Sequence, residues 1–362
     1  MRKILKSLVL VCLCACMLFT DIQPAYAYTI KVDSTKYGYS TLSTQEKKMY
    51  KKILSAINEE KKSVTFEKYS DYKFVSNLYR IIQQDNPDIF WLKSAQVTAT
   101  SRNNKPVSTT ITMKYSMSKA EKDKKQAKIE TRTKQLLKQM PKDADDYTKA
   151  KYIYETVIKS VSYDKENMNN AANQQMTSAL LLGESVCAGY SKMYAYLLQK
   201  AGIQAMYMSG QAKGSGHAWV VLKISNQYYY SDVTWGDSFE NFSDDYINYT
   251  YFLCQLDDFK IDHVFDKTYY VPVPLAASKK YAYFNHEDLY FTKFTKTERA
   301  FIDAKLQSGT EYFQIKCVND TVLNAFRNYL YRKSEVVSLS MDDDRHILTV
   351  FLKNLDEGID IE

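Results

Sequence analysis

The stretch ESVCAGYSKMYAYLLQK, residues 184–200, decides the fold of this 362-residue chain. Its apolar residues predict a helix that begins near Cys187 and ends near Gly202, since glycine is common just after a helix. The unpaired N–H groups and the positive dipole end of a first helical turn both favour a thiolate. Cys187 is therefore a candidate nucleophile. The alternative, a small buried hydrophobic residue, is the more common role of an isolated cysteine.

The hydrophobic pattern changes on both sides of this helix. A core-packing helix with apolar residues from Ala150 to Val161 precedes it. After it, the apolar residues recur with a period of two instead of 3.6, which predicts strands. The three strands are QAMYMSGQ (204–211), HAWVVLKI (217–224) and QYYYSDVTW (227–235). Helices followed by a run of strands predict an α+β fold.

The turn between the last two strands fixes which side chains share a face. A two-residue turn pairs Ile224 with Gln227, and therefore Trp219 with Asp232. His217 then lies on the face of Trp219, because side chains alternate along a strand. His217 and Asp232 become diagonal neighbours within reach of each other. A three-residue turn would place them on opposite faces.

Together, Cys187, His217 and Asp232 supply a nucleophile, a base and an orienting carboxylate, which covalent acyl transfer requires. Each residue also has an ordinary alternative. His217 begins a strand after a Gly/Ser loop, where a histidine is commonly structural or exposed. Asp232 stands where an aspartate caps the turn that follows.

The segments VCAGYSKMYAYLLQKAGI (186–203) and GHAWVVLKISNQYYYSDVTWGD (216–237) closely resemble the core of the transglutaminase-like superfamily. The shared pattern is a cysteine at a helix start, a Gly-His-Ala-Trp strand and an aspartate in Asp-x-Thr-Trp. The resemblance covers about residues 145–240. It implies a papain-like core, in which the cysteine-bearing helix packs on an antiparallel sheet. It also implies that Cys187 is the nucleophile, His217 the base and Asp232 the orienting acid.

The resemblance implies a cysteine-dependent acyl transfer on peptide or glutamine amides, through a thioester and without a cofactor. Water as acceptor would make the protein a peptidase or deamidase, and an amine would make it a cross-linking transglutaminase. One alternative is a non-catalytic scaffold or binding protein of the cell wall on the same fold. Another is a papain-like peptidoglycan endopeptidase of a different family, which typically uses a second histidine where this sequence has DVTW.

Several aromatic residues are weaker candidates. Trp219, Trp235 and Tyr190 are expected to contact substrate, with core packing as the alternative. The backbone N–H of Cys187 is the natural first donor of an oxyanion hole, which acyl transfer requires. The second donor is left open; Trp91, Tyr163 and Tyr190 are the candidates, and core packing is again the alternative.

The first residues predict export. A basic MRKILK, a short apolar run and an Ala25-Tyr26-Ala27 cleavage site have the features of a signal peptide over residues 1–27. A lipoprotein signal with Cys16 as the anchor is the competing interpretation. We expect a secreted protein, free or associated with the cell wall. The flanking regions resemble those of exported proteins from low-GC Gram-positive bacteria.

Beyond the signal peptide, the sequence predicts three parts: an α+β module at 28–144, the catalytic domain at 145–270 and an α/β module at 271–362. The net charge of +7 is mild, and we expect a protein or cell-wall peptide as substrate. No basic stripe interleaved with aromatic residues indicates nucleic acid. No later apolar run approaches the roughly 20 residues of a membrane helix, so stable membrane insertion is not expected.

The remaining cysteines and histidines suggest no cross-link or metal. Cys254 and Cys317 are expected to be buried apolar residues, with a disulfide between them as the alternative. The other histidines lack ligand spacing, so no metal site is predicted; these are His263, His286 and His346. The run Asp342–Asp344 is interpreted as a polar hairpin turn.

Overall fold

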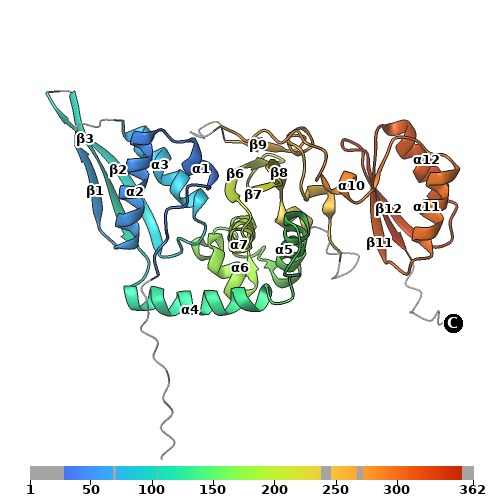
Figure 1. The fold of residues 1–362 in the computed structure, drawn as a ribbon, viewed down its shortest axis with the longest axis horizontal. Helices are drawn as coiled ribbons and strands as arrows, with labels where there is room; N and C mark the ends of the chain where they lie inside the picture. The colour runs from blue at the N-terminus through green and yellow to red at the C-terminus, as the bar shows by residue number, and fades with distance from the viewer. Residues whose placement is uncertain (1–27, 68–70, 104, 238–245, 267–271, 353–362) are drawn as a thin grey trace, which may run out of the picture.

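A computed structural model describes residues 28–67, 71–103, 105–237, 246–266 and 272–352. It arranges them as three parts in a row, with the cysteine-bearing helix in the middle part (Figure 1). The expected signal peptide at 1–27 and the alternative lipid anchor at Cys16 lie outside the described residues. Within the described ranges, no helix has the length and apolar character needed to cross a membrane.

The N-terminal part is a small α+β module. Its antiparallel sheet has the order β1-β3-β2, and helices lie against it. Its strands and helices are β1 (Ser63–Glu67), β2 (Leu92–Arg102), β3 (Lys105–Tyr115), α1 (Tyr37–Thr41), α2 (Thr44–Asn58) and α3 (Tyr72–Asp85). Ser43 and Glu46 form a capping box at the start of α2.

The long charged helix α4 (Lys119–Leu136) runs beneath the N-terminal and middle parts (Figure 1). Ser118 and Glu121 form a capping box at its start. The helix packs against α6 of the middle part. It therefore joins the two parts along one side.

The middle part holds an antiparallel sheet of order β8-β7-β6-β9. Its strands are β6 (Ala205–Ala212), β7 (Ser215–Ile224), β8 (Gln227–Ser231) and β9 (His263–Phe265), and its longer helices are α5 (Asp146–Ser160), α6 (Met176–Leu182) and α7 (Cys187–Lys200). Shorter elements are β4 (Ser162–Tyr163), η1 (Ala171–Gln174), β5 (Glu184–Ser185), α8 (Val233–Gly236), η2 (Tyr249–Tyr251) and α9 (Leu256–Phe259). The predicted core of a cysteine-bearing helix on an antiparallel sheet is confirmed.

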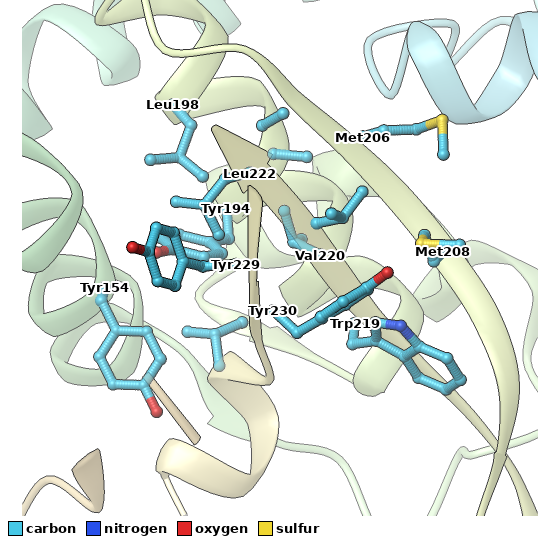
Figure 2. Close-up of a cluster of buried hydrophobic side chains, with 14 of the residues drawn as sticks. Tyr154, Tyr194, Leu198, Met206, Met208, Trp219, Val220, Leu222, Tyr229 and Tyr230 are labelled. Carbon is cyan, nitrogen blue, oxygen red and sulfur yellow. The ribbon is translucent and has the colours of Figure 1, made fainter. Parts of the chain in front are cut away.

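Helix α7 packs on β6 and β7 through a cluster of buried side chains (Figure 2). Tyr194 and Leu198 are one helical turn apart and therefore lie on one face of α7. Val220 and Leu222, two residues apart on β7, share one face of the sheet. All four are fully buried, and each such side chain contributes about 1.5–3 kcal/mol to folding. This packing fixes the start of α7 relative to the sheet.

The C-terminal part mixes parallel and antiparallel pairing. Its sheet has the order β10-β11-β13-β12, in which only β10 and β11 are parallel. The elements are α10 (Tyr283–His286), β10 (Tyr290–Phe291), α11 (Lys296–Leu306), β11 (Tyr312–Cys317), α12 (Asp320–Leu330), β12 (Val336–Asp342) and β13 (Ile347–Leu352). The predicted hairpin that turns at the aspartate run is β12–β13.

The three cysteines of the described residues are free thiols. Cys254 and Cys317 are buried, as the sequence suggested, and the alternative disulfide between them is absent. Burial raises the pKa of Cys317 to about 12 and the pKa of Cys254 even further. Neither thiol is therefore suited to act as a nucleophile at neutral pH.

Candidate active site

Cys187 is the first residue of α7 and is partly buried. Within the described residues, no side chain caps this helix end, because Val186 occupies the N-cap position. The chain before it is held by Ser185, whose hydroxyl donates to the carbonyl of Asn173 at 2.6 Å. Gly189 is required here, since a Cβ at that position would lie 1.9 Å from the Ser185 Oγ. The tight entry into α7 thus fixes the position of the thiol.

The turn between β7 and β8 has the two residues that the sequence predicted. Ser225 and Asn226 both have positive φ, 46° and 68°, as a two-residue hairpin turn requires. Ile224 pairs with Gln227, and the paired ladder continues to Val220 and Ser231. This register places the following aspartate on the face of His217.

His217 and Asp232 are in direct contact. His217 Nε2 lies 2.6 Å from Asp232 Oδ2. The other carboxylate oxygen accepts from the backbone N–H groups of Thr234 at 3.0 Å and Trp235 at 3.2 Å. Asp232 therefore caps α8, as the ordinary alternative for this residue expected, and also contacts His217. The cap also ends β8 at Ser231, not at Trp235 as the sequence pattern suggested.

The two side chains strongly alter each other's ionisation. Burial raises the pKa of the fully buried Asp232, but His217 and then His263 hold it well below its usual range. Burial lowers the pKa of His217, whereas Asp232, and then hydrogen bonding and charge from Cys187, raise it to about 10. The pair is therefore ionised at neutral pH.

The thiol of Cys187 completes the constellation. Hydrogen bonding and charge from this thiol are among the causes that raise the pKa of His217. Because Asp232 occupies Nε2 of the imidazole, Nδ1 is the nitrogen left for the sulfur. The structure thus brings together all three residues that the sequence singled out.

A second histidine, which the sequence patterns missed, also contacts the carboxylate. His263 Nε2 lies 3.2 Å from Asp232 Oδ2, and its Nδ1 lies 2.6 Å from Asp262 Oδ1. His263 begins β9, which pairs with the edge of β6. The sequence offers only an Asp-His pair before a short apolar run, and nothing local indicates that this segment joins the sheet.

The ligand-type atoms of His217, Asp232 and His263 lie within 4.8 Å of one another, so they could hold a metal ion. Two ligands of a tetrahedral zinc ion, each at 2.0–2.1 Å, lie about 3.3 Å apart. The 2.6 Å between His217 and Asp232 is a hydrogen-bond distance and does not fit such a pair. The expectation of no metal site stays a prediction.

Two of the three expected substrate contacts are buried side chains. Tyr190 is fully buried, and its hydroxyl donates to the carbonyl of Val161 at 2.6 Å and lies 2.7 Å from Asp237. Trp219 is also fully buried, with the rings of Phe259 and His263 against it. Side chains without exposed surface cannot contact a substrate in this conformation. Both residues have the packing role that was the alternative.

Trp235 is partly exposed and keeps its candidate role. Its ring lies 5.1 Å from that of His217, centroid to centroid. It lines a cavity of about 1140 Å³, to which Lys213, Asn248 and Asp343 also contribute. The cavity lies between the middle and C-terminal parts, next to the catalytic candidates.

The three candidates for a second oxyanion donor lie in different surroundings. Trp91 is buried in the N-terminal part, where its ring N–H donates to Ile57, and Tyr190 is buried as described above. Tyr163 is partly exposed. Burial and the charge of Cys187 raise the pKa of its phenol overall, although a hydrogen bond from the Cys187 backbone N–H acts to lower it. Of the three, Tyr163 alone lies beside the nucleophile candidate.

One family model and several solved structures match parts of this chain. No curated protein matched the sequence. Among solved structures, a TGase matches with 14% identity and a TM-score of 0.31, over 44% of this chain and 48% of that one. A proposed cysteine protease from Cytophaga hutchinsonii matches with 13% identity and a TM-score of 0.26, over 40% of this chain and 65% of that one.

A proposed protease from Parabacteroides distasonis matches with 11% identity and a TM-score of 0.25, over 38% of this chain and 35% of that one. The chain thus spans less than two thirds of the length of each of these proteins. The model of the transglutaminase-like superfamily matches residues 134–235, which include Cys187, His217 and Asp232. The middle part of this chain therefore carries a transglutaminase-like superfamily domain.

Proposed function

We propose that this protein is an exported, cysteine-dependent acyl-transfer enzyme that acts on peptide or glutamine amides. The observation that carries the proposal is the 2.6 Å contact between His217 and the buried Asp232, with Cys187 as the other partner of the imidazole. A thiol, an imidazole and a carboxylate in this order form the general constellation of covalent acyl transfer.

In the first half-reaction, the sulfur of Cys187 attacks the amide carbonyl carbon as a thiolate, beside His217 that is already protonated. The C–S bond forms while the carbonyl π electrons move onto oxygen. When the tetrahedral intermediate collapses, the C–N bond breaks and His217 Nδ1 gives its proton to the leaving nitrogen. The products are a free amine or ammonia and a thioester on Cys187. Asp232 keeps the imidazole oriented throughout.

In the second half-reaction, His217 takes a proton from the incoming nucleophile, which attacks the thioester carbonyl. The C–S bond breaks, and the sulfur leaves as the thiolate beside the imidazolium. Water as nucleophile gives a carboxylic acid, and an amine gives a new amide. The reaction is hydrolysis in the first case and cross-linking in the second.

The oxyanion formed in both steps needs donors next to Cys187. The phenol of Tyr163 lies by the backbone N–H of Cys187 and has a hydroxyl proton of its own to donate. We assign Tyr163 as a side-chain donor of the oxyanion hole. Trp235 and the adjacent cavity supply the surface on which the rest of the substrate binds.

The export signal places the substrate outside the cell. Protein side chains and cell-wall peptides are the amides available there, and the mild positive charge favours contact with an anionic wall. Both the location and this choice of substrate rest on the N-terminal sequence pattern.

The test uses the chain from residue 28 onward, a glutamine-containing peptide and a fluorescent primary amine. Ammonia release and amine incorporation are followed together, so that hydrolysis and cross-linking are separated. Cys187→Ala should abolish both signals and also the labelling of the protein by iodoacetamide at neutral pH. Cys254→Ala is the matched control and should retain them, because that thiol is buried. Full turnover by Cys187→Ala would refute the proposal. The absence of turnover in every variant would favour a non-catalytic scaffold.

A further inference from the structure

A buried chain of alternating charges connects the C-terminal part with the triad. Arg345 Nη2 lies 2.6 Å from Asp262 Oδ1, and the same carboxylate oxygen lies 2.6 Å from His263 Nδ1. On its other side, His263 Nε2 lies 3.2 Å from Asp232 Oδ2, which also holds His217. Each cation in the series is thus followed by an anion.

Both ring nitrogens of His263 lie next to carboxylate oxygens. Each ring nitrogen faces a carboxylate, and an ionised carboxylate can only accept hydrogen bonds. Burial raises the pKa of Asp262, but His263, Arg345 and Tyr251 lower it overall, so Asp262 is ionised at neutral pH. Two ionised acceptors require an N–H on both sides of the ring. The side chain of His263 is almost fully buried, so these two carboxylates are the acceptors that its ring nitrogens meet.

The ring of His263 has little freedom to leave this position. It stacks on Phe259 with 3.9 Å between ring centroids, and Trp235 lies 4.7 Å away. The titratable groups that face His263 from the elements around it are His217 on β7, Asp232 before α8, Tyr251 in η2 and Asp262 before β9. Arg345, between β12 and β13, lies behind Asp262 and contacts that carboxylate.

Arg345 brings the C-terminal part into this network. It stands in the turn between β12 and β13 and is only 4% exposed. Its Nη1 lies 3.0 Å from Asp342 Oδ2, and its guanidinium lies 5.1 Å from the ring centre of Tyr251. The hydroxyl of Tyr251 in turn donates to Asp262 Oδ2 at 2.8 Å. Asp262 is thus held in place by a residue from another part of the chain.

We propose that His263 is a positioning residue of the triad, kept as an imidazolium by Asp262 and by Arg345 of the C-terminal part. It fixes the carboxylate of Asp232 and weakens the hold of that carboxylate on the proton of His217. The inference rests on the proposed function, because it assigns His263 a role in proton transfer at the same site. It also assigns the C-terminal part a role in supporting the active site.

The physical reason is competition for one oxygen. His217 and His263 both bind Oδ2 of Asp232, so the charge on His263 reduces the stabilisation that Asp232 gives to protonated His217. An acid that holds its proton too tightly is a poor donor to a leaving amine. The two rings are 5.7 Å apart. At that separation and an effective dielectric constant of about 20, removing one charge shifts the pKa of the other by about two units.

The experiment is ¹⁵N NMR of the imidazole nitrogens, in which the chain's four histidines are assigned by substitution. In the wild-type protein at pH 7.5, both ring nitrogens of His263 should be protonated. The titration of His217 is measured in a Cys187→Ala background, which removes one group that raises its pKa. In this background, His263→Gln should raise the pKa of His217 by at least one unit. His346→Gln is the matched control from the turn of Arg345, where His346 pairs with Asp320, and it should leave the titration unchanged.

An unprotonated ring nitrogen on His263 overturns the proposal, even where the variants do not fold. An unchanged titration of His217 in a folded His263→Gln protein also overturns it. In turnover, His263→Gln should lower kcat about 10-fold or more with KM unchanged, since the residue does not touch substrate. Arg345→Met should lower kcat in the same direction, and Arg345→Lys should recover part of the loss.

The NMR measurements do not depend on turnover. A wild-type protein without activity would refute the proposed function, whereas an active wild type with a neutral His263 would refute this inference alone.

Discussion

The Asp232→Asn substitution keeps the shape of the side chain and removes its charge. The asparagine oxygen can still cap α8 by accepting from Thr234 and Trp235. Its amide nitrogen, however, faces the two imidazoles and cannot accept their protons. His217 must then move its proton to Nδ1, the side of Cys187, where it no longer serves as the base.

The magnitude follows from the contacts that are lost. Oδ2 of Asp232 accepts two charge-assisted hydrogen bonds, one from each imidazole. Each hydrogen bond is worth about 1.5–3 kcal/mol. The free energy of unfolding of the variant should therefore be about 3–6 kcal/mol lower near neutral pH. The loss of the orienting carboxylate should also lower kcat by about 10⁴-fold, as for a triad aspartate in general.

The stability difference should depend on pH. Burial lowers the pKa of His217 but Asp232 raises it, to about 10, so its contribution is complete below the ordinary value of 6.5 and is lost as the pH rises through about 10. Asp232 has a lowered pKa, so its contribution is complete above about pH 4 and is lost only at more acidic pH. The cost of the substitution should therefore be largest at pH 4–6.5 and smaller at pH 10.

Urea denaturation followed by tryptophan fluorescence at pH 6 and pH 10 measures this difference. Asp258→Asn is the matched control, because it makes the same change in an ion pair with Lys316 that is partly exposed. It should cost less than about 1 kcal/mol. The assigned ion pair is wrong if Asp232→Asn loses as little unfolding free energy as the control does. It is also wrong if the loss of unfolding free energy grows toward pH 10.

Three further predictions concern the surroundings of the triad. Gly210→Ala would place a Cβ 2.3 Å from the carbonyl oxygen of Val264; it should cost about 1–3 kcal/mol in urea denaturation, whereas Gly216→Ala, with no atom within 4 Å, should cost much less, and equal costs would contradict the packing argument. Tyr163→Phe should lower kcat about 10²-fold with KM unchanged if the phenol stabilises the oxyanion, and a change under twofold in steady-state kinetics would assign Tyr163 to packing. Prolonged EDTA treatment should leave turnover unchanged, and a loss that zinc restores would show that His217 belongs to a metal site.

The sequence determined the parts of the site that depend on local geometry. The helix start at Cys187 follows from apolar periodicity, and the pairing of His217 with Asp232 follows from alternation across a two-residue turn. Both rules act over a few residues, so the pattern alone carries the information. The three-part motif in its order was enough to predict the transglutaminase-like core, which the family match confirms.

Exposure of the aromatic residues was decided by packing. Tyr190 and Trp235 both follow a triad residue closely in sequence, yet Tyr190 is fully buried and Trp235 is partly exposed. The difference arises from which elements cover each side chain, and alternation or helical period does not specify that.

Only the tertiary structure decided what lies behind Asp232 in the candidate site. His263 is 31 residues from Asp232, and Arg345 is in another part of the chain. Their contacts depend on β9 joining the edge of β6 and on the β12–β13 turn reaching Asp262. Such long-range pairings leave no periodic trace in the sequence, because each segment satisfies its own local pattern. The charges meet only when the separate parts pack together and exclude water from between them.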